Sequence, residues 1–94
     1  MNIRFYVDPQ TGEPHIHNHD VDESEVEDIL EVPGEVRSGR EGTLVALGRT
    51  SSGRYLKVIY KPEVERDGAF VITAYDLRGK ALRSYRRRRR RKQK

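Results

Sequence analysis

The sequence predicts an α+β fold: a small antiparallel sheet of about four strands, packed by one helix from the N-terminal half, with a basic C-terminal helix or disordered tail. Short strand-like segments separated by turn-rich links predict the sheet, and one well-signalled helix precedes most of them. An arginine run, Arg86 to Arg91, nearly ends the chain. With 94 residues and an apolar fraction of 34%, we expect one domain, residues 1–85, followed by an arginine-rich tail, residues 86–94.

The composition of the chain excludes several classes of protein. The chain has no cysteine, which rules out disulfides and thiolate metal sites and makes the reducing cytosol the expected compartment. Its apolar runs are no longer than that from Leu44 to Leu47, and Met1 leads into an alternating stretch rather than a secretory signal. We therefore predict a cytoplasmic protein with no membrane partner.

Charge is divided sharply along the chain, although the net charge is only +4. Residues 1–35 carry ten acids against one arginine, and residues 36–82 carry nine bases against five acids. Residues 83–94 carry nine bases and no acid. A phosphate backbone is the first partner to consider for such a basic segment, while the acidic segment either compensates it or meets a cationic partner.

The first element is a strand. Ile3, Phe5 and Val7 alternate with Arg4 and Tyr6, which is the pattern of a half-buried strand. The turn-forming sequence DPQTGE follows and redirects the chain.

Three histidines, His15, His17 and His19, alternate with other residues after this turn. If the segment is extended, all three imidazoles lie on one face and could bind a metal; the favoured interpretation is a solvated connection, with no metal ligand and no cofactor assigned. His19 directly precedes the predicted helix and is the best placed of the three for acid–base chemistry.

A helix is predicted from Asp22 to Leu30 or Glu31. Asp22 is a suitable N-cap, Glu25 occupies the third position of a capping box, and Pro33 ends the element. The acids of this helix suit its dipole, and an alternative is that they dock the arginine tail in the free protein.

The rest of the sheet comes from the middle of the chain. The segment 34–42 is polar and glycine-rich, and we interpret it as a loop or an irregular edge strand. Further strands, linked as an antiparallel meander to which the first strand adds, are expected at Thr43–Gly48, Arg54–Tyr60 and Phe70–Tyr75.

The C-terminal segment has few apolar residues. A helix is possible from Lys80, with Ala81, Leu82 and Tyr85 as its only apolar contacts. Adjacent arginines repel one another, so we expect Arg86–Lys94 to be frayed or disordered when free and ordered on binding.

The uncovered face of the sheet is the predicted working surface. Burial of Leu56 and Val58 exposes Tyr55 and Lys57 on the opposite face, and the last strand places Val71, Thr73 and Tyr75 together. Tyrosines beside cations are typical of RNA binding by stacking and phosphate contact. The candidate nucleic-acid-binding residues are Arg49, Tyr55, Lys57, Lys80, Arg83, Arg86, Arg87, Arg88, Arg89, Arg90 and Arg91.

Several motifs together resemble the BrnT-type toxins of bacterial toxin–antitoxin systems, which belong to the RelE-like ribonuclease superfamily. The matching segments are Asn18-His19-Asp20-Val21, Gly48-Arg49, Ser52-Gly53-Arg54, Val58-Ile59-Tyr60 and Ile72-Thr73-Ala74, followed by the basic segment. The chain departs from the family in the short turn before the histidines, where the family has a Lys-bearing helix, and in Tyr75, where the family has Arg. Its C-terminal segment is also almost purely Arg, whereas the family has a helix of mixed acids and bases there.

The resemblance implies a metal-independent ribonuclease that cleaves mRNA by attack of a ribose 2′-hydroxyl on the adjacent phosphate. It assigns Arg54 and Arg78 to the phosphate, with Arg49 and Lys57 in support. His19 or Tyr75 would act as base or acid. It also implies an antitoxin that covers the basic surface. The alternative is a non-catalytic protein that binds RNA or the ribosome through the same residues.

Overall fold

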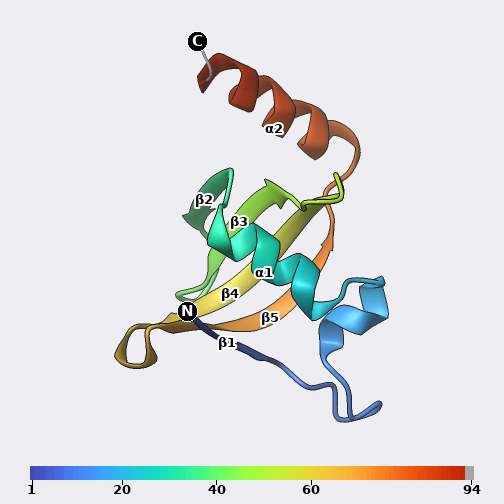
Figure 1. Ribbon diagram of the computed structural model, residues 1–94, viewed down its shortest axis with the longest axis vertical. Coiled ribbons are helices and arrows are strands. Elements are labelled where there is room, and N and C mark those ends of the chain that lie inside the picture. The colour runs from blue at the N-terminus through green and yellow to red at the C-terminus, as the bar shows by residue number, and fades with distance from the viewer. Residues whose placement is uncertain (93–94) are drawn as a thin grey trace.

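Five strands form one mixed sheet in the computed structural model of the protein, which describes residues 1–92 (Figure 1). The strand order across the sheet is β1-β5-β4-β3-β2. The elements, in chain order, are β1 (Asn2–Phe5), the 3-10 helix η1 (His15–His19), α1 (Glu23–Glu31), β2 (Glu35–Ser38), β3 (Leu44–Arg49), β4 (Tyr55–Glu63), the 3-10 turn η2 (Val64–Arg66), β5 (Gly68–Asp76) and α2 (Gly79–Lys92).

The α+β class is confirmed, but the prediction of about four antiparallel strands is wrong in two respects. A fifth strand, β2, pairs antiparallel with β3 at the edge of the sheet, which confirms the edge-strand alternative for segment 34–42, and β1 pairs parallel with β5. An edge strand needs no buried face, so the polar sequence of β2 gave only a weak strand signal. The direction of β1 is set by the long connection through η1 and α1, which no local turn motif encodes.

Helix α1 covers one face of the sheet, and its start follows the predicted capping box. The Asp22 carboxylate accepts a hydrogen bond from the Glu25 amide at 2.9 Å, and the Glu25 carboxylate accepts one from the Asp22 amide at 3.0 Å. Val26 and Ile29 are fully buried against Leu56 of the sheet. The predicted helix and its capping box are therefore confirmed.

A β-bulge in β5 changes which side chains share a face. Ile59 lies opposite Thr73 and Tyr60 lies opposite Val71, so Ile72 is an extra residue between the two pairs. Val71 consequently points into the core beneath α1, where it is fully buried. The prediction that Val71 shares a face with Thr73 and Tyr75 is wrong for this reason.

The opposite face of the sheet is partly covered by α2 rather than open. Leu77 and Tyr85 pack with Val45 and Leu47 of β3 in a second apolar cluster. Part of the expected working surface therefore lies under or beside this helix. Neither helix among residues 1–92 has the length and apolar content that a membrane span requires.

The arginine run is helical where the structure describes it. Helix α2 continues through Lys92, so the expectation of a frayed segment is wrong for residues 86–92; residues 93–94 lie outside the described part. Polar contacts stabilise the end of the helix. Arg88 makes two hydrogen bonds to the Glu35 carboxylate, and Arg89 donates to the carbonyl oxygen of Gly34.

The histidine segment is a 3-10 helix and not an extended strand. Its last residue, His19, is followed by Asp20 in the left-handed conformation with φ 57°. Since a 3-10 helix has three residues per turn, alternate imidazoles do not share a face as they would on a strand. The geometry on which the metal alternative depended is therefore not formed.

Candidate functional site

An open pocket lies where η1 meets the end of β5. It has a volume of about 390 Å³ and is lined by His19, Asp20, Tyr75, Asp76 and Arg78. The His19 and Tyr75 rings lie 5.7 Å apart between centroids, tilted by 51°. Three of the four predicted catalytic side chains, from segments far apart in the sequence, thus line one cavity, which we call the His19 pocket.

Arg78 is the exposed cation of this pocket. Its side chain is 81% exposed and donates a hydrogen bond to the Asp76 carboxylate at 2.7 Å. Because this exposed pair is well solvated, it costs little to open when an anion approaches.

Arg54, the fourth predicted catalytic residue, is held behind the pocket by acids and carbonyl groups. Its Nε donates to Asp76 at 2.7 Å, and its Nη1 donates to Glu25 at 2.9 Å and to the carbonyl oxygen of Asp20 at 2.6 Å. Its Nη2 lies 3.4 Å from the carbonyl oxygen of His19. The guanidinium therefore ties α1 to β5 and fixes the backbone beside His19, with few donors left for a phosphate.

Asp76 is the shared acid of this network and was not among the predicted site residues. The hydrogen bond from Arg54 is the largest cause that holds the pKa of Asp76 below its usual value, and Arg78 adds to it. Asp76 directly follows the predicted strand and lies two residues before Arg78, which was the only sequence signal for its role.

A longer groove of about 590 Å³ lies beside the His19 pocket, between the sheet and α2, and includes Tyr75, Asp76 and Arg78 among its lining. Val45, Leu47, Leu77 and Ala81 are the aliphatic residues of the groove. Lys57 extends over the Tyr75 ring at 5.7 Å, and the remaining basic residues of the lining are Arg37 and Arg88.

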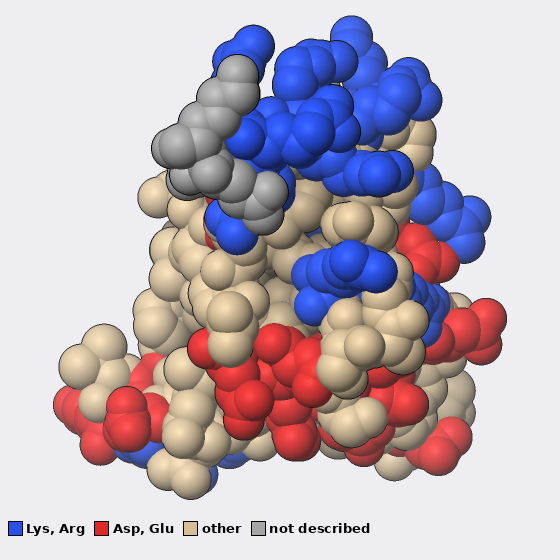
Figure 2. Space-filling view, turned by 45° about the horizontal axis from the view of Figure 1, so that its top comes forward, with Lys and Arg blue, Asp and Glu red and all other residues tan. Residues whose placement is uncertain are grey.

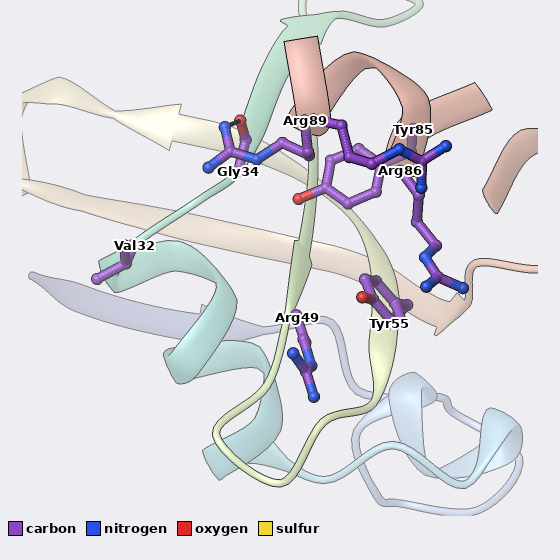
Figure 3. Close-up of a pocket in the computed structure, with 8 residues that line it drawn as sticks. Val32, Gly34, Arg49, Tyr55, Tyr85, Arg86 and Arg89 are labelled. Atoms are coloured by element: carbon purple, nitrogen blue, oxygen red, sulfur yellow. Dashed lines mark hydrogen bonds between the residues drawn. The ribbon is translucent and has the colours of Figure 1, made fainter. Parts of the chain in front are cut away.

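Arg49 and Tyr55 lie on the other flank of α2, in a second pocket of about 380 Å³ that we call the Tyr55 pocket (Figure 3). Its lining includes Tyr85, Arg86 and Arg90 from the helix. The predicted RNA-binding surface is therefore divided by α2: Lys57 and Tyr75 lie on one side, and Arg49 and Tyr55 on the other.

The cations of α2 are mostly unpaired. Arg88 is the helix residue that pairs with an acid within the described part of the chain, and that acid is Glu35 of β2. The exposed Lys and Arg of α2 are Lys80, Arg83, Arg86, Arg87, Arg90 and Arg91. Figure 2 shows basic side chains gathered over the α2 end of the molecule and acidic ones toward the opposite end.

The acids of α1 do not dock the arginine run, so the alternative proposed from the sequence is wrong for the described residues. Glu25 binds Arg54, and Asp28 accepts hydrogen bonds from the amide and hydroxyl of Ser51. The acids of α1 thus bind the hairpin between β3 and β4 or take part in the capping box, while α2 extends away from α1.

The three histidines have separate partners. His17 lies 2.7 Å from Glu23, whose hydrogen bond raises the pKa of His17, and the His15 ring lies 3.4 Å from Asp8. His15 and His19 meet edge to face at 5.4 Å between centroids. Within residues 1–92, no three His, Asp or Glu side chains are arranged to hold a metal ion.

Comparison of the chain with protein-family models, with curated proteins and with solved structures gave no match in any of the three.

Proposed function

We propose that the protein binds RNA through α2 and the adjoining sheet face, and cleaves it in the His19 pocket as a BrnT-like endoribonuclease. The observation that carries the proposal is the meeting of His19, Tyr75 and Arg78 in one open cavity, beside a helix with many unpaired cations. Unpaired arginines bind phosphates without sequence preference, which suits a surface that binds the backbone of single-stranded RNA.

The chemistry needs a base, an acid and a cation, and side chains of this chain supply all three. His19 takes the proton from the ribose 2′-hydroxyl as its oxygen bonds to phosphorus, and the bond from phosphorus to the 5′-oxygen breaks. Tyr75 donates a proton to the leaving 5′-oxygen, and Arg78 offsets the charge on the phosphorus oxygens. The products are a 2′,3′-cyclic phosphate and a 5′-hydroxyl. Arg54 acts as a positioning residue in this scheme.

The test is a cleavage assay with the full chain and labelled single-stranded RNA, with and without ribosomes, in the presence of EDTA. We expect cyclic-phosphate products from RNA and no cleavage of a 2′-deoxy strand. Substitution His19→Ala or Tyr75→Phe should lower the rate by about 10²–10⁴-fold, while RNA affinity stays within a few fold. His17→Ala is the matched control, because His17 pairs with Glu23 outside the pocket. Intact RNA under both conditions would overturn the assignment.

Non-catalytic RNA or ribosome binding is the second candidate, and the geometry of Arg54 favours it. With the Arg54 donors engaged, Arg78 is left as the exposed guanidinium that the pocket offers to a phosphate group, and Asp76 offsets part of its charge. If binding is the whole function, Arg78→Ala should change affinity little and deletion of residues 86–94 should abolish most of it. If cleavage is the function, Arg78→Ala should abolish cleavage and spare most affinity.

The toxin assignment also proposes a partner: an acidic antitoxin that covers α2, with both proteins in the cytoplasm where mRNA is found. The basic helix directly after the last strand supports the resemblance, because the family carries an Arg-rich helix there. A small neighbouring reading frame whose product co-purifies with this chain and blocks its RNA binding is the expected finding. A neighbouring product that leaves RNA binding unchanged would count against the partner.

A further inference from the structure

The Tyr55 pocket is built from three separate parts of the chain. Val32 and Gly34 come from the link between α1 and β2, Arg49 and Tyr55 come from the facing ends of β3 and β4, and the rest comes from α2. Figure 3 shows these side chains around one hollow. No Asp or Glu is among the residues that line it.

The aromatic side chains of this pocket are fixed. Tyr85 is only 3% exposed and meets Tyr55 edge to face, with 6.2 Å between the ring centroids. A Cβ on Gly34 would lie 1.8 Å from the Tyr85 hydroxyl oxygen, so glycine is required for that hydroxyl to reach its place. Arg89 is bound to the carbonyl oxygen of Gly34 at 2.7 Å, which holds the helix against the link.

Two arginines converge on the Tyr55 ring. The guanidinium carbons of Arg49 and Arg86 lie 5.7 Å and 5.8 Å from the ring centroid. With Arg90, they are cations of the pocket that form no ion pair within the described part of the chain. Like charges gathered without a carboxylate repel, and a bound anion relieves that repulsion.

We propose that the Tyr55 pocket binds a phosphate monoester: the terminal phosphate of a nucleic-acid strand or of a free nucleotide. A monoester carries about −1.5 to −2 charges at neutral pH, against −1 for an internal phosphodiester, and so suits three unpaired guanidinium groups better. The volume of about 380 Å³ is at the lower end of the range for small-ligand sites. The Tyr55 pocket is separate from the His19 pocket, so this proposal also applies if the protein binds RNA without cleaving it.

The experiment measures binding of one short 2′-O-methyl strand in three forms: 5′-phosphorylated, 3′-phosphorylated and unphosphorylated. Such a strand lacks the attacking hydroxyl, so the result does not depend on cleavage. We expect at least one phosphorylated form to bind the full chain about tenfold more tightly than the unphosphorylated form. Titration of AMP by calorimetry tests the free nucleotide as the source.

Substitution Arg49→Ala or Arg86→Ala should remove the advantage of the phosphorylated strand, or the AMP binding. Arg66→Ala is the matched control, since it removes the same charge from the η2 turn, outside the Tyr55 pocket, and should preserve the preference. Equal affinity for the three strands together with no AMP binding would overturn the proposal. So would a preference that persists in both the Arg49 and the Arg86 variants.

Discussion

Arg54 is the side chain on which the geometry of the His19 pocket depends. One guanidinium contacts the acid at the start of α1, the acid at the end of β5, and the backbone just after His19. Its side chain is 26% exposed, so it is partly removed from water, and its acids compensate that loss. A role in positioning His19 and Asp76 follows from these contacts.

Arg54→Gln should therefore destabilise the fold. The substitution leaves Glu25 and Asp76 without their shared cation, which should cost about 2 kcal/mol and lower Tm by roughly 10 °C. Thermal unfolding followed by circular dichroism measures the loss. Arg40→Gln is the control, because this exposed loop arginine makes no side-chain hydrogen bond within residues 1–92. An equal Tm for the Arg54 variant and the control would contradict this account.

The pH dependence of the same variant follows from the lowered pKa of Asp76. A carboxyl group with a depressed folded-state pKa contributes stability above its unfolded value of 3.8, and that stability is lost as pH falls through the folded value. Since the Arg54 hydrogen bond is the largest cause of the shift, the stability gap between wild type and Arg54→Gln should be constant above about pH 5 and narrow below pH 4.

Sequence patterns predicted the side chains of the pocket better than their partners. His19 precedes a well-signalled helix and Tyr75 ends a predicted strand, whereas Arg78 was assigned through the resemblance to the toxin family. The acid partners of Arg54 lie 29 and 22 residues away, and nothing local specifies such a pairing. The contact between the Tyr85 hydroxyl and Gly34 could not be predicted from the sequence for the same reason, because it depends on how α2 docks on the sheet.

Helix α2 is the element that departs most from expectation, and its docking explains why. Apolar anchoring ends at Tyr85, yet the helix continues because Arg88 and Arg89 bind Glu35 and the carbonyl oxygen of Gly34. The sequence predicted α1 through its capping box, and β3 to β5 through strand patterns separated by turn-forming links. It did not specify the direction of β1 or the bulge at Ile72, since both depend on pairing between distant segments.

Glu35→Gln should loosen the second half of α2. Arg88 is the largest cause that lowers the pKa of Glu35, so the pair is formed above the usual carboxyl pKa and is lost as pH falls through the lowered one. We expect amide exchange over residues 86–91 to rise about fivefold, as for the loss of a charge-assisted contact worth about 1 kcal/mol. Exchange in β4 should not change.

Glu27→Gln serves as the control for that measurement. It removes the same charge from the exposed face of α1, where Glu27 makes no side-chain hydrogen bond within the described residues. Unchanged exchange in α2 of the Glu35 variant would show that the Arg88–Glu35 pair does not hold the second half of the helix, which would then depend on Tyr85 and on the Arg89 bond to the carbonyl oxygen of Gly34.

Seen whole, the molecule is electrically polarised, with basic groups over α2 and acidic groups toward the other end (Figure 2). Charge segregation along the sequence already indicated this polarity. The sequence left open whether α2 folds back onto the acids of α1, and the fold decides that it does not. Because α2 extends away from them, its cations stay available to an anionic partner. The polarity should therefore orient RNA onto the α2 end.

The salt dependence of the proposed RNA binding tests that orientation. Replacing Arg87, Arg90 and Arg91 by Gln keeps good helix formers in α2 while removing three exposed cations. Each cation that contacts a single-stranded phosphate contributes about 0.7 to the slope of log affinity against log salt concentration, so the slope should fall by about 2. Replacing Arg40, Lys61 and Arg66 by Gln changes the net charge equally at exposed sites outside α2. If the net charge of the whole molecule governed binding, the slope would fall by the same amount in both variants. If α2 contacts the RNA backbone, the slope should fall only in the first variant.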